Sequence, residues 1–294
     1  MSIVLPTFNG SKHLVSSIES CLRQSHSNLE LIVVDDGSGN ETQEILQGFT
    51  DDRMLVICQE MNRGLPTALN TGFARATGTF LTWTSDDNEY TTDALESLVG
   101  FLQRHPDVDF VYADFLEIDW QGEILRRVRV GDPEELHYHN CVSCCFMFRR
   151  EVFEVIGDFN PRARLAEDSE YWLRVFQRFR MAPYRERPLY RYRKHAGSLS
   201  GSGYLAYEAI RVEAKHRRRI LRNGWLRYAH RMSQAYTEEA FARYANQDLT
   251  GAWKCMVRGV SLNPSRLANR GVLSILVRSL LSQLTQSGAG TNLP

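Results

Sequence analysis

The feature that most constrains the fold of this chain is the alternation of short apolar runs and amphipathic segments in residues 1–115. Buried parallel strands are continuous apolar runs, whereas helices carry apolar residues three and four positions apart. Alternation at this spacing predicts an α/β sheet whose parallel strands are joined by right-handed helical crossovers. The expected strands are 2–6, 29–34, 54–58, 79–84 and 110–114, and the expected helices are 12–24, 41–47, 66–76 and 92–104.

The pattern becomes less regular after residue 115. A hairpin is expected at 117–128, with Trp120-Gln121-Gly122 at its centre, and amphipathic helices are expected after residue 203. The other expected elements are strands at 142–149 and 189–193 and helices at 168–179, 204–221, 235–246 and 252–261. The Ser- and Gly-rich stretch 198–203 is the expected boundary between a body of residues 1–202 and a helical extension of residues 203–294.

Polar side chains follow three of the predicted strands at the point where each strand ends. Asn9 follows the first strand, Asp35 and Asp36 follow the second, and Asp86 and Asp87 follow the fourth. Ligands of doubly wound sheets bind outside the carboxyl ends of the strands. Adjacent carboxylates repel each other unless a cation or a donor-rich ligand lies among them. The last pair therefore suits Mg²⁺ or Mn²⁺, which take oxygen ligands and bridge the phosphates of a nucleotide.

Each acidic motif also has a plainer interpretation when it is taken alone. Asp86 and Asp87 could cap the start of a helix, and residues 35–38 could form a turn. Glu167 and Asp168 precede an apolar-periodic helix. A carboxylate there could act as a general base on an attacking hydroxyl, or it could only interact favourably with the helix dipole.

The charge of the chain is uneven although its formal net value is zero. Residues 201–294 contain 14 Lys and Arg against 5 Asp and Glu, which gives +9, and the preceding residues contain 21 against 30, which gives −9. The basic run 215–219 could favour contact with an anionic membrane surface, and 266–284 could lie in such an interface. We favour packing of this last segment on the body. Nucleic acid is not expected as a partner, because no stacking or groove-reading motif accompanies the basic run.

The start of the chain and its cysteines indicate a cytoplasmic protein. The chain opens directly into an apolar run without the pattern of a secretory leader, and no stretch reaches the roughly 20 apolar residues of a membrane span. Peripheral contact at the inner face of the membrane stays open. Cys141, Cys144 and Cys145 could suggest zinc, but only His137 and His139 lie near as further ligands. We favour reduced thiols in an apolar strand.

The motifs occur in a fixed order, and in that order they resemble family 2 of the inverting glycosyltransferases, which have the GT-A fold. The matching segments are 2–9, 31–38, 62–70, 76–80, 84–87, 167–174 and 192–200, with Ser-Ile-Val-Leu-Pro-Thr-Phe-Asn as the first and Thr-Ser-Asp-Asp in the place of the variable D-x-D-type motif. The resemblance covers about the first 200 residues. It implies a mixed GT-A sheet flanked by helices, with a nucleotide-binding part of about 1–115 and an acceptor part of about 116–202.

The resemblance also implies how a nucleotide would be held. Pro6, Thr7, Asn9 and Asp36 would bind it, with Asp36 facing the nucleobase. Arg63 would be a weaker contact to the nucleobase or the phosphates.

The resemblance implies a catalytic role for a second set of residues. Asp87 would bind Mg²⁺ or Mn²⁺ directly, and Asp86 would contact the ribose or the donor sugar. Asp168 would be the general base, and Glu167 would shape the acceptor pocket. His195, which taken alone is as typical of a solvated loop residue, would assist at the metal or the diphosphate.

The chain departs from the family pattern at one place. Many members have a further Asp where this chain has Thr84 or Ser85, so the metal site would rest mainly on Asp87. The implied activity is a single displacement with inversion, in which a sugar moves from a nucleotide-diphosphate donor, with UDP as the leading nucleotide. The hydroxyl acceptor would belong to a glycan or a lipid-linked molecule, in glycan, polysaccharide or lipopolysaccharide synthesis.

Two other functions stay open. A nucleotidyltransferase would be expected to carry a Gly-rich, basic phosphate loop after the first strand, whereas residues 7–12 contain only Gly10 and Lys12. A non-catalytic nucleotide-sugar-binding or scaffold protein is the other alternative. The presence of both Asp87 and Asp168 argues against it, because a pure binder does not need a base. The oligomeric state is left open by the sequence.

Overall fold

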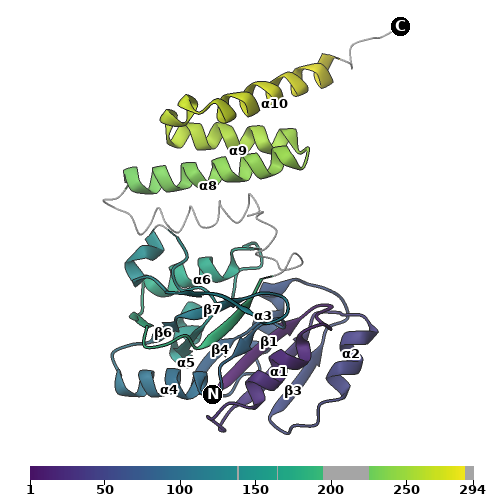
Figure 1. Ribbon diagram of the computed structural model, residues 1–294, viewed down its shortest axis with the longest axis vertical. Helices are drawn as coiled ribbons and strands as arrows, with labels where there is room; N and C mark the ends of the chain where they lie inside the picture. The colour runs from purple at the N-terminus through teal and green to yellow at the C-terminus, as the bar shows by residue number, and fades with distance from the viewer. Residues whose placement is uncertain (138, 164, 195–224, 289–294) are drawn as a thin grey trace. The chain divides into compact units, whose positions relative to one another are not determined.

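The computed structural model describes residues 1–137, 139–163, 165–194 and 225–288 (Figure 1). The chain divides into two compact units, Met1–Gly201 and Ser202–Pro294. The described part of the first unit is an α/β structure, and that of the second unit is helical.

The first unit is built on a large mixed sheet. Its strands are β1 (Ser2–Thr7), β2 (Glu30–Asp35), β3 (Met54–Cys58), β4 (Phe80–Trp83), β6 (Phe110–Ala113), β9 (Phe146–Arg149) and β10 (Met181–Tyr184). They lie in the order β10-β6-β9-β4-β1-β2-β3. Strand β9 is antiparallel to both of its neighbours, and the other pairs are parallel. The predicted mixed α/β sheet is therefore confirmed.

Helices flank this sheet (Figure 1). They are α1 (Leu14–Leu22), α2 (Asn40–Gln47), α3 (Leu65–Phe73), α4 (Ala94–Arg104), α5 (Arg150–Ile156) and α6 (Glu167–Phe176), with a 3₁₀ turn η1 (Pro133–His137). Helix α3 packs on β1 and β2. Its close approach requires a glycine, because a Cβ on Gly72 would lie 2.3 Å from Cγ1 of Val4. A larger residue would push the helix away from the strand that leads into the candidate site.

An aromatic core fixes α6 against the sheet. The ring centroids of Phe146 and Trp172 are 4.5 Å apart, those of Phe110 and Trp172 are 4.8 Å apart, and Phe110 stacks on Phe148 at 5.6 Å. All four side chains are fully buried. Burial of one such ring stabilises the fold by about 2–3 kcal/mol relative to its exposure. The same packing sets the position of the first turn of α6, where Glu167 and Asp168 lie.

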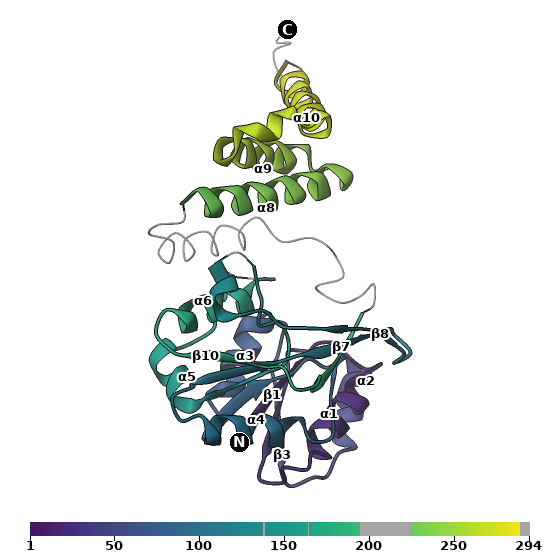
Figure 2. The ribbon, with the colours of Figure 1, turned by 60° about the vertical axis from the view of Figure 1, so that its left-hand side comes forward.

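A smaller sheet extends beside the large one (Figure 2). Its strands are β5 (Glu89–Tyr90), β7 (Phe115–Ile118), β8 (Ile124–Val128) and β11 (Tyr190–Arg193), in the order β5-β11-β7-β8. Strands β7 and β8 form the predicted hairpin. Strand β11 pairs with β7 on one side and with β5 on the other. Strand β11 thereby joins β5, which begins two residues after Asp87, to strand β7 of the hairpin.

Several boundaries differ from the sequence predictions. The strand expected from residue 142 begins only at Phe146, because Asn140 Oδ1 accepts hydrogen bonds from the Val142 and Ser143 amides and Ser143 has a φ of 62°. Strands β5 and β10 and helix α5 were not predicted, since segments of two to seven residues carry little periodicity. The helix expected at 204–221 lies outside the described residues.

The second unit contains three packed helices among its described residues. They are α8 (Trp225–Ala245), α9 (Leu249–Leu262) and α10 (Arg270–Gly288), with a 3₁₀ turn η3 (Pro264–Ala268). Their core consists of Ala240, Ala252, Cys255, Met256, Val272 and Ile275. On the other side of α10, Leu273, Val277 and Leu280 are exposed. Across the described part of the chain, no helix has the length and apolar character needed to cross a membrane.

Candidate active site

The carboxyl ends of β1 and β2 are tied together side by side. Thr7 and Asp35 are register partners, and the Asp36 amide donates a hydrogen bond to the Thr7 carbonyl oxygen at 2.9 Å. The Asp36 carboxylate is buried and accepts from the amides of Arg63 at 2.9 Å and Gly64 at 2.8 Å. Gly64 has a φ of +88°, a conformation that favours glycine. The structure thus brings Asp36 and Arg63 together through the Arg63 main chain.

Asn9 joins the turns that follow these two strands. Its φ is +55°, its amide donates to Ser38 Oγ at 2.9 Å, and its Oδ1 accepts from the Gly39 amide at 2.9 Å. Ser38 in turn donates its amide to Asp35 Oδ1 at 2.9 Å. These bonds make one cross-linked surface of the two turns. Asn9 is exposed on it, whereas Pro6 is buried within β1.

Asp86 follows β4 and faces the end of β1. Thr7 Oγ1 donates to Asp86 Oδ2 at 2.6 Å. A Cβ on Gly10 would lie 1.9 Å from the same oxygen, so only glycine leaves room for this carboxylate. Burial, with a contribution from the neighbouring Asp87 charge, raises the pKa of Asp86 to about 6, although the Thr7 hydrogen bond opposes the shift. Two carboxylates in a confined place thus lie at the sheet edge where the sequence predicted them.

Asp87 is held through its main chain. Its carbonyl oxygen accepts a hydrogen bond from Nε of Arg193 at 2.9 Å. Within the ranges that the structure describes, no three His, Cys, Asp or Glu side chains gather closely enough to hold a metal ion. The carboxylates of Asp86 and Asp87 therefore fit Mg²⁺ or Mn²⁺ only if further oxygen ligands, such as water and the phosphate oxygens of a bound nucleotide, complete the coordination. His195 lies outside the described residues.

Thr84 is turned into the protein interior. Its side chain is 1% exposed, and its Oγ1 lies 2.5 Å from the hydroxyl oxygen of Tyr190. Ser85 contributes its carbonyl oxygen to a hydrogen bond from Ser17 Oγ at 2.8 Å. The Thr84 side chain thus supports the link between β4 and the smaller sheet.

The second acidic pair begins helix α6. Asp168 is partly exposed; its Oδ2 accepts from Asn140 Nδ2 at 2.8 Å, and its Oδ1 accepts from the Ser169 amide at 2.6 Å. Glu167 is 7% exposed. Burial, followed by the Asp168 charge, raises the pKa of Glu167 to about 7. The Asp168 carboxylate is thus held by the Asn140 and Ser169 donors at the N-terminal, positive end of the α6 dipole.

Three polar residues of this region were missed in the sequence. Asn140 holds Asp168, Tyr190 contacts Thr84, and Arg193 holds Asp87. Arg193 lies in the segment 192–200, which resembles the family, but the sequence of that segment does not show which group Arg193 contacts. Asn140 is 28 residues from Asp168, and no spacing rule connects them.

The nearby cysteines are free thiols, and Cys141 Sγ donates to the Asp132 carbonyl oxygen at 3.2 Å.

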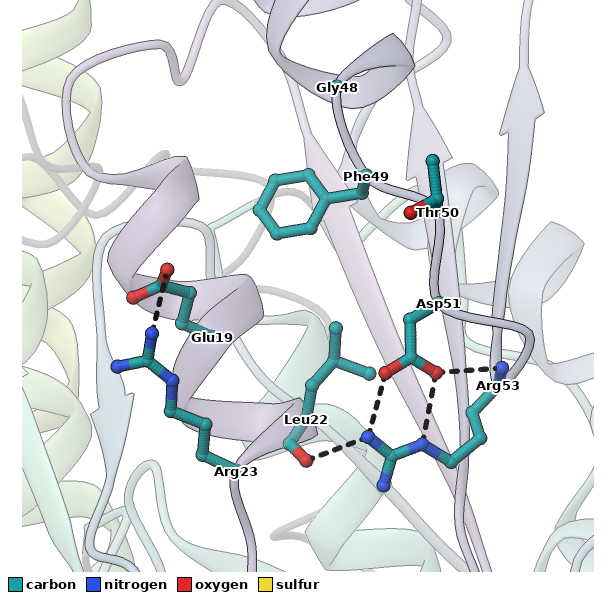
Figure 3. Close-up of a pocket in the computed structure, with 8 residues that line it drawn as sticks. All are labelled: Glu19, Leu22, Arg23, Gly48, Phe49, Thr50, Asp51 and Arg53. Atoms are coloured by element: carbon teal, nitrogen blue, oxygen red, sulfur yellow. Dashed lines mark hydrogen bonds and ion pairs between the residues drawn. The ribbon is translucent and has the colours of Figure 1, made fainter.

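A separate hollow of about 450 Å³ lies near the end of α1 and the loop between α2 and β3 (Figure 3). Phe49 and Leu22 line it together with two ion pairs, Arg53–Asp51 at 2.8 Å and Arg23–Glu19 at 3.1 Å. Arg53 also donates to the Leu22 carbonyl oxygen at 2.9 Å. None of the predicted site residues lines this hollow, so we assign it no part in the site.

The comparison with known families decides the class of this protein. Residues 2–157 match the sequence model of "Glycosyl transferase family 2". The chain belongs to this family. A Mycobacterium bovis protein named "PGL/p-HBAD biosynthesis glycosyltransferase" is 31% identical over 183 residues, covering 60% of this chain and 69% of that protein. An uncharacterized glycosyltransferase of Rickettsia prowazekii is 28% identical over 188 residues, covering 60% of this chain and 58% of that protein.

Solved structures agree on the fold of this glycosyltransferase. S. aureus TarS 1-349 in complex with UDP-GlcNAc has a TM-score of 0.70 and 17% identity, covering 90% of this chain and 82% of that chain. Its complex with UDP has a TM-score of 0.67 and 17% identity, covering 90% and 81% of the two chains. The predicted family and GT-A fold are therefore confirmed. The predicted roles of individual residues, the inversion and the metal remain predictions.

Proposed function

We propose that this glycosyltransferase moves a sugar from a UDP-linked donor to a hydroxyl group of a glycan or lipid-linked acceptor, with inversion at the anomeric carbon. The observation that carries the proposal is the joining of Asp86 and Asp87 to the end of β1 through the Thr7–Asp86 hydrogen bond of 2.6 Å. This places acidic oxygens beside the turns of β1 and β2, at the edge where such sheets bind ligands. The UDP and UDP-GlcNAc in the TarS complexes support the choice of nucleotide.

The nucleotide part of the proposed site consists of the cross-linked turns. Thr7, Asn9 and Asp36, with Pro6 behind them, form the surface for the nucleoside. Arg63 borders it, because its main chain is fixed by Asp36. Preformed hydrogen bonds lower the cost of ordering these turns on binding.

The residue proposed to hold a divalent cation is Asp87, with His195 as a further candidate outside the described residues. Asp86, beside Asp87, is proposed to contact the ribose or the donor sugar. Mg²⁺ or Mn²⁺ bound there would neutralise charge on the departing diphosphate. The protein's own contribution would be the Asp87 carboxylate and the Asp86 carboxylate that Thr7 fixes beside the donor sugar.

Asp168 is the proposed general base. It removes the proton of the acceptor hydroxyl while that oxygen bonds to the anomeric carbon, and the bond from this carbon to the diphosphate oxygen breaks on the opposite face. Asn140 and the Ser169 amide orient the carboxylate by the hydrogen bonds described above. Glu167, buried beside it, is proposed to shape the acceptor pocket.

Calorimetric titration of UDP, GDP and dTDP tests the donor part of this proposal. Each nucleotide is titrated with Mn²⁺ and with EDTA into the wild type, Asp87→Ala and the control Asp51→Ala, whose carboxylate lines the hollow of Figure 3. We expect Mn²⁺ to strengthen UDP binding in the wild type and in the control, and we expect this Mn²⁺-dependent gain to be lost in Asp87→Ala, which should bind UDP only as tightly as the wild type does in EDTA. Absence of binding for all three nucleotides would refute the proposed donor site and favour the scaffold alternative.

Contact with an anionic membrane surface stays a prediction. The basic run 215–219 lies outside the described residues. The exposure of Leu273, Val277 and Leu280 on α10 supports such contact. Flotation of the full-length chain with vesicles that contain phosphatidylserine tests it, and the absence of co-flotation would count against it.

A further inference from the structure

Arg193 is a buried arginine in contact with the segment that follows β4. It is the last residue of β11, and only 4% of its surface is exposed. A buried charge is costly unless it is paired and hydrogen-bonded. Arg193 meets this condition through Glu89, whose Oε1 accepts from Nη2 at 2.6 Å. The charge of the guanidinium is therefore balanced within the smaller sheet.

The remaining donors of Arg193 reach main-chain oxygens of two different segments. Nε donates to the Asp87 carbonyl oxygen at 2.9 Å. Nη1 donates to the carbonyl oxygens of Trp120 at 3.1 Å and Asp119 at 3.3 Å. The first segment follows β4, and the second is the turn of the β7–β8 hairpin. Because the guanidinium is planar with its donors in a fixed fork, one rigid group fixes both segments at once.

The main chain of Arg193 strengthens the same connection. Its amide donates to Asn88 Oδ1 at 2.7 Å. The segment from Asp87 to Glu89 therefore contacts Arg193 at three successive residues, through a carbonyl oxygen, an amide oxygen and a carboxylate. Such a set leaves the Asp87 main chain little freedom to move.

Arg191, on the same strand, offers a comparison. Its Nη2 donates to the Gly122 carbonyl oxygen at 2.7 Å, and its Nε lies 3.6 Å from Glu89 Oε2. It thus shares with Arg193 both the hairpin turn and the ionic partner. The contact to Asp87 belongs to Arg193. Arg191 is also less buried, with 36% of its side chain exposed against 4% for Arg193, so it controls for loss of the hairpin and Glu89 contacts but not for burial.

We infer that Arg193 is a positioning residue that sets the orientation of Asp87 for divalent-cation binding. The inference rests on the proposed function, in which Asp87 holds the cation. Arg193 acts through the Asp87 carbonyl group and the hairpin turn. Loss of a residue that orients a metal ligand typically weakens metal affinity by about 10-fold to 100-fold, so the effect is measurable without any acceptor.

The test uses the full chain with Mn²⁺ and UDP as probes. Mn²⁺ affinity in the presence of UDP is measured by electron paramagnetic resonance, and UDP affinity in EDTA is measured by calorimetry. We expect Arg193→Lys, which keeps the charge but not the fork, to lose about 10-fold or more in Mn²⁺ affinity while its UDP affinity in EDTA is unchanged. Arg191→Lys is the matched control and should keep both affinities.

A second variant allows the inference to be tested even if Arg193→Lys does not fold. Glu89→Gln keeps every donor of Arg193 but removes its ionic partner, so we expect a smaller decrease in Mn²⁺ affinity, again without an effect in EDTA. Thermal denaturation reports whether each variant is folded. If Arg193→Lys is not folded, the Mn²⁺ affinity of Glu89→Gln alone tests the inference. Wild-type Mn²⁺ affinity in the folded variants would overturn the inference only. A wild-type chain that binds neither UDP nor Mn²⁺ would overturn the proposed function as well.

Discussion

The two acidic pairs of the first unit, Asp86-Asp87 and Glu167-Asp168, are alike in composition but are supported in different ways. In each pair the first carboxylate has a raised pKa, about 6 for Asp86 and about 7 for Glu167, with burial as the largest cause. The Asp87 main chain is held by an arginine, whereas the Asp168 carboxylate is held by an asparagine and a helix amide. A sheet edge without a helix dipole suits an added cation, and a carboxylate oriented by two donors suits proton removal.

The largest expected effect separates the two pairs by function. Asp168→Asn keeps the shape of the side chain but removes the base, so turnover should fall by about 10²–10⁴-fold. UDP binding with Mn²⁺ should be unchanged, because the donor pair is intact. Product formation and calorimetry measure the two quantities, and Asp107→Asn, at an exposed ion pair with Arg180, is the control. Near-wild-type turnover in Asp168→Asn would show that the base assignment is wrong.

A second prediction concerns the support of Asp168. Asn140→Ala removes the donor to Asp168 Oδ2 and also the oxygen that accepts from the Val142 and Ser143 amides. A small displacement of a catalytic group can cost up to about 100-fold in rate. We expect turnover to fall by about 10-fold, with Mn²⁺-dependent UDP binding preserved. Asn160→Ala removes a comparable side-chain bond to the Arg162 amide and should leave turnover unchanged. Equal losses in the two variants would indicate that Asn140 acts only on folding.

The raised pKa of Glu167 leads to a prediction about stability and pH. The folded-state pKa of about 7 lies above the ordinary value of 4.5, so the folded protein binds this proton more tightly than the unfolded chain. The cost of ionising Glu167 is therefore absent below about pH 4.5 and complete above about pH 7. Glu167→Gln should raise the free energy of unfolding by about 1–3 kcal/mol at pH 8 and by little at pH 4. Urea denaturation at both pH values measures it, and an equal change at both would contradict the assigned cause.

The sequence revealed the two pairs more readily than their supports. The strands that end at Thr7, Asp35 and Trp83 follow from continuous apolar runs, and parallel pairing brings their ends together. The partner of each carboxylate depends on tertiary packing. Nothing in the sequence near Asn140 shows that it reaches Asp168 across 28 residues. Such contacts depend on the aromatic core that packs α6 against the sheet. The local periodicity of the sequence does not predict this packing.

The smallest expected effect on function concerns Thr84, which follows β4 and precedes the Asp86-Asp87 pair. In the structure its Oγ1 lies 2.5 Å from the Tyr190 hydroxyl oxygen in a buried setting. Thr84→Val would leave a buried hydroxyl without this partner and should lower the free energy of unfolding by about 1–3 kcal/mol. Mn²⁺-dependent UDP binding should not change, because a side chain that points into the interior does not reach the cation. A loss of Mn²⁺ affinity in a folded Thr84→Val variant would extend the metal site to residue 84, and the contrast between a pair at a sheet edge and a pair at a helix start would no longer hold.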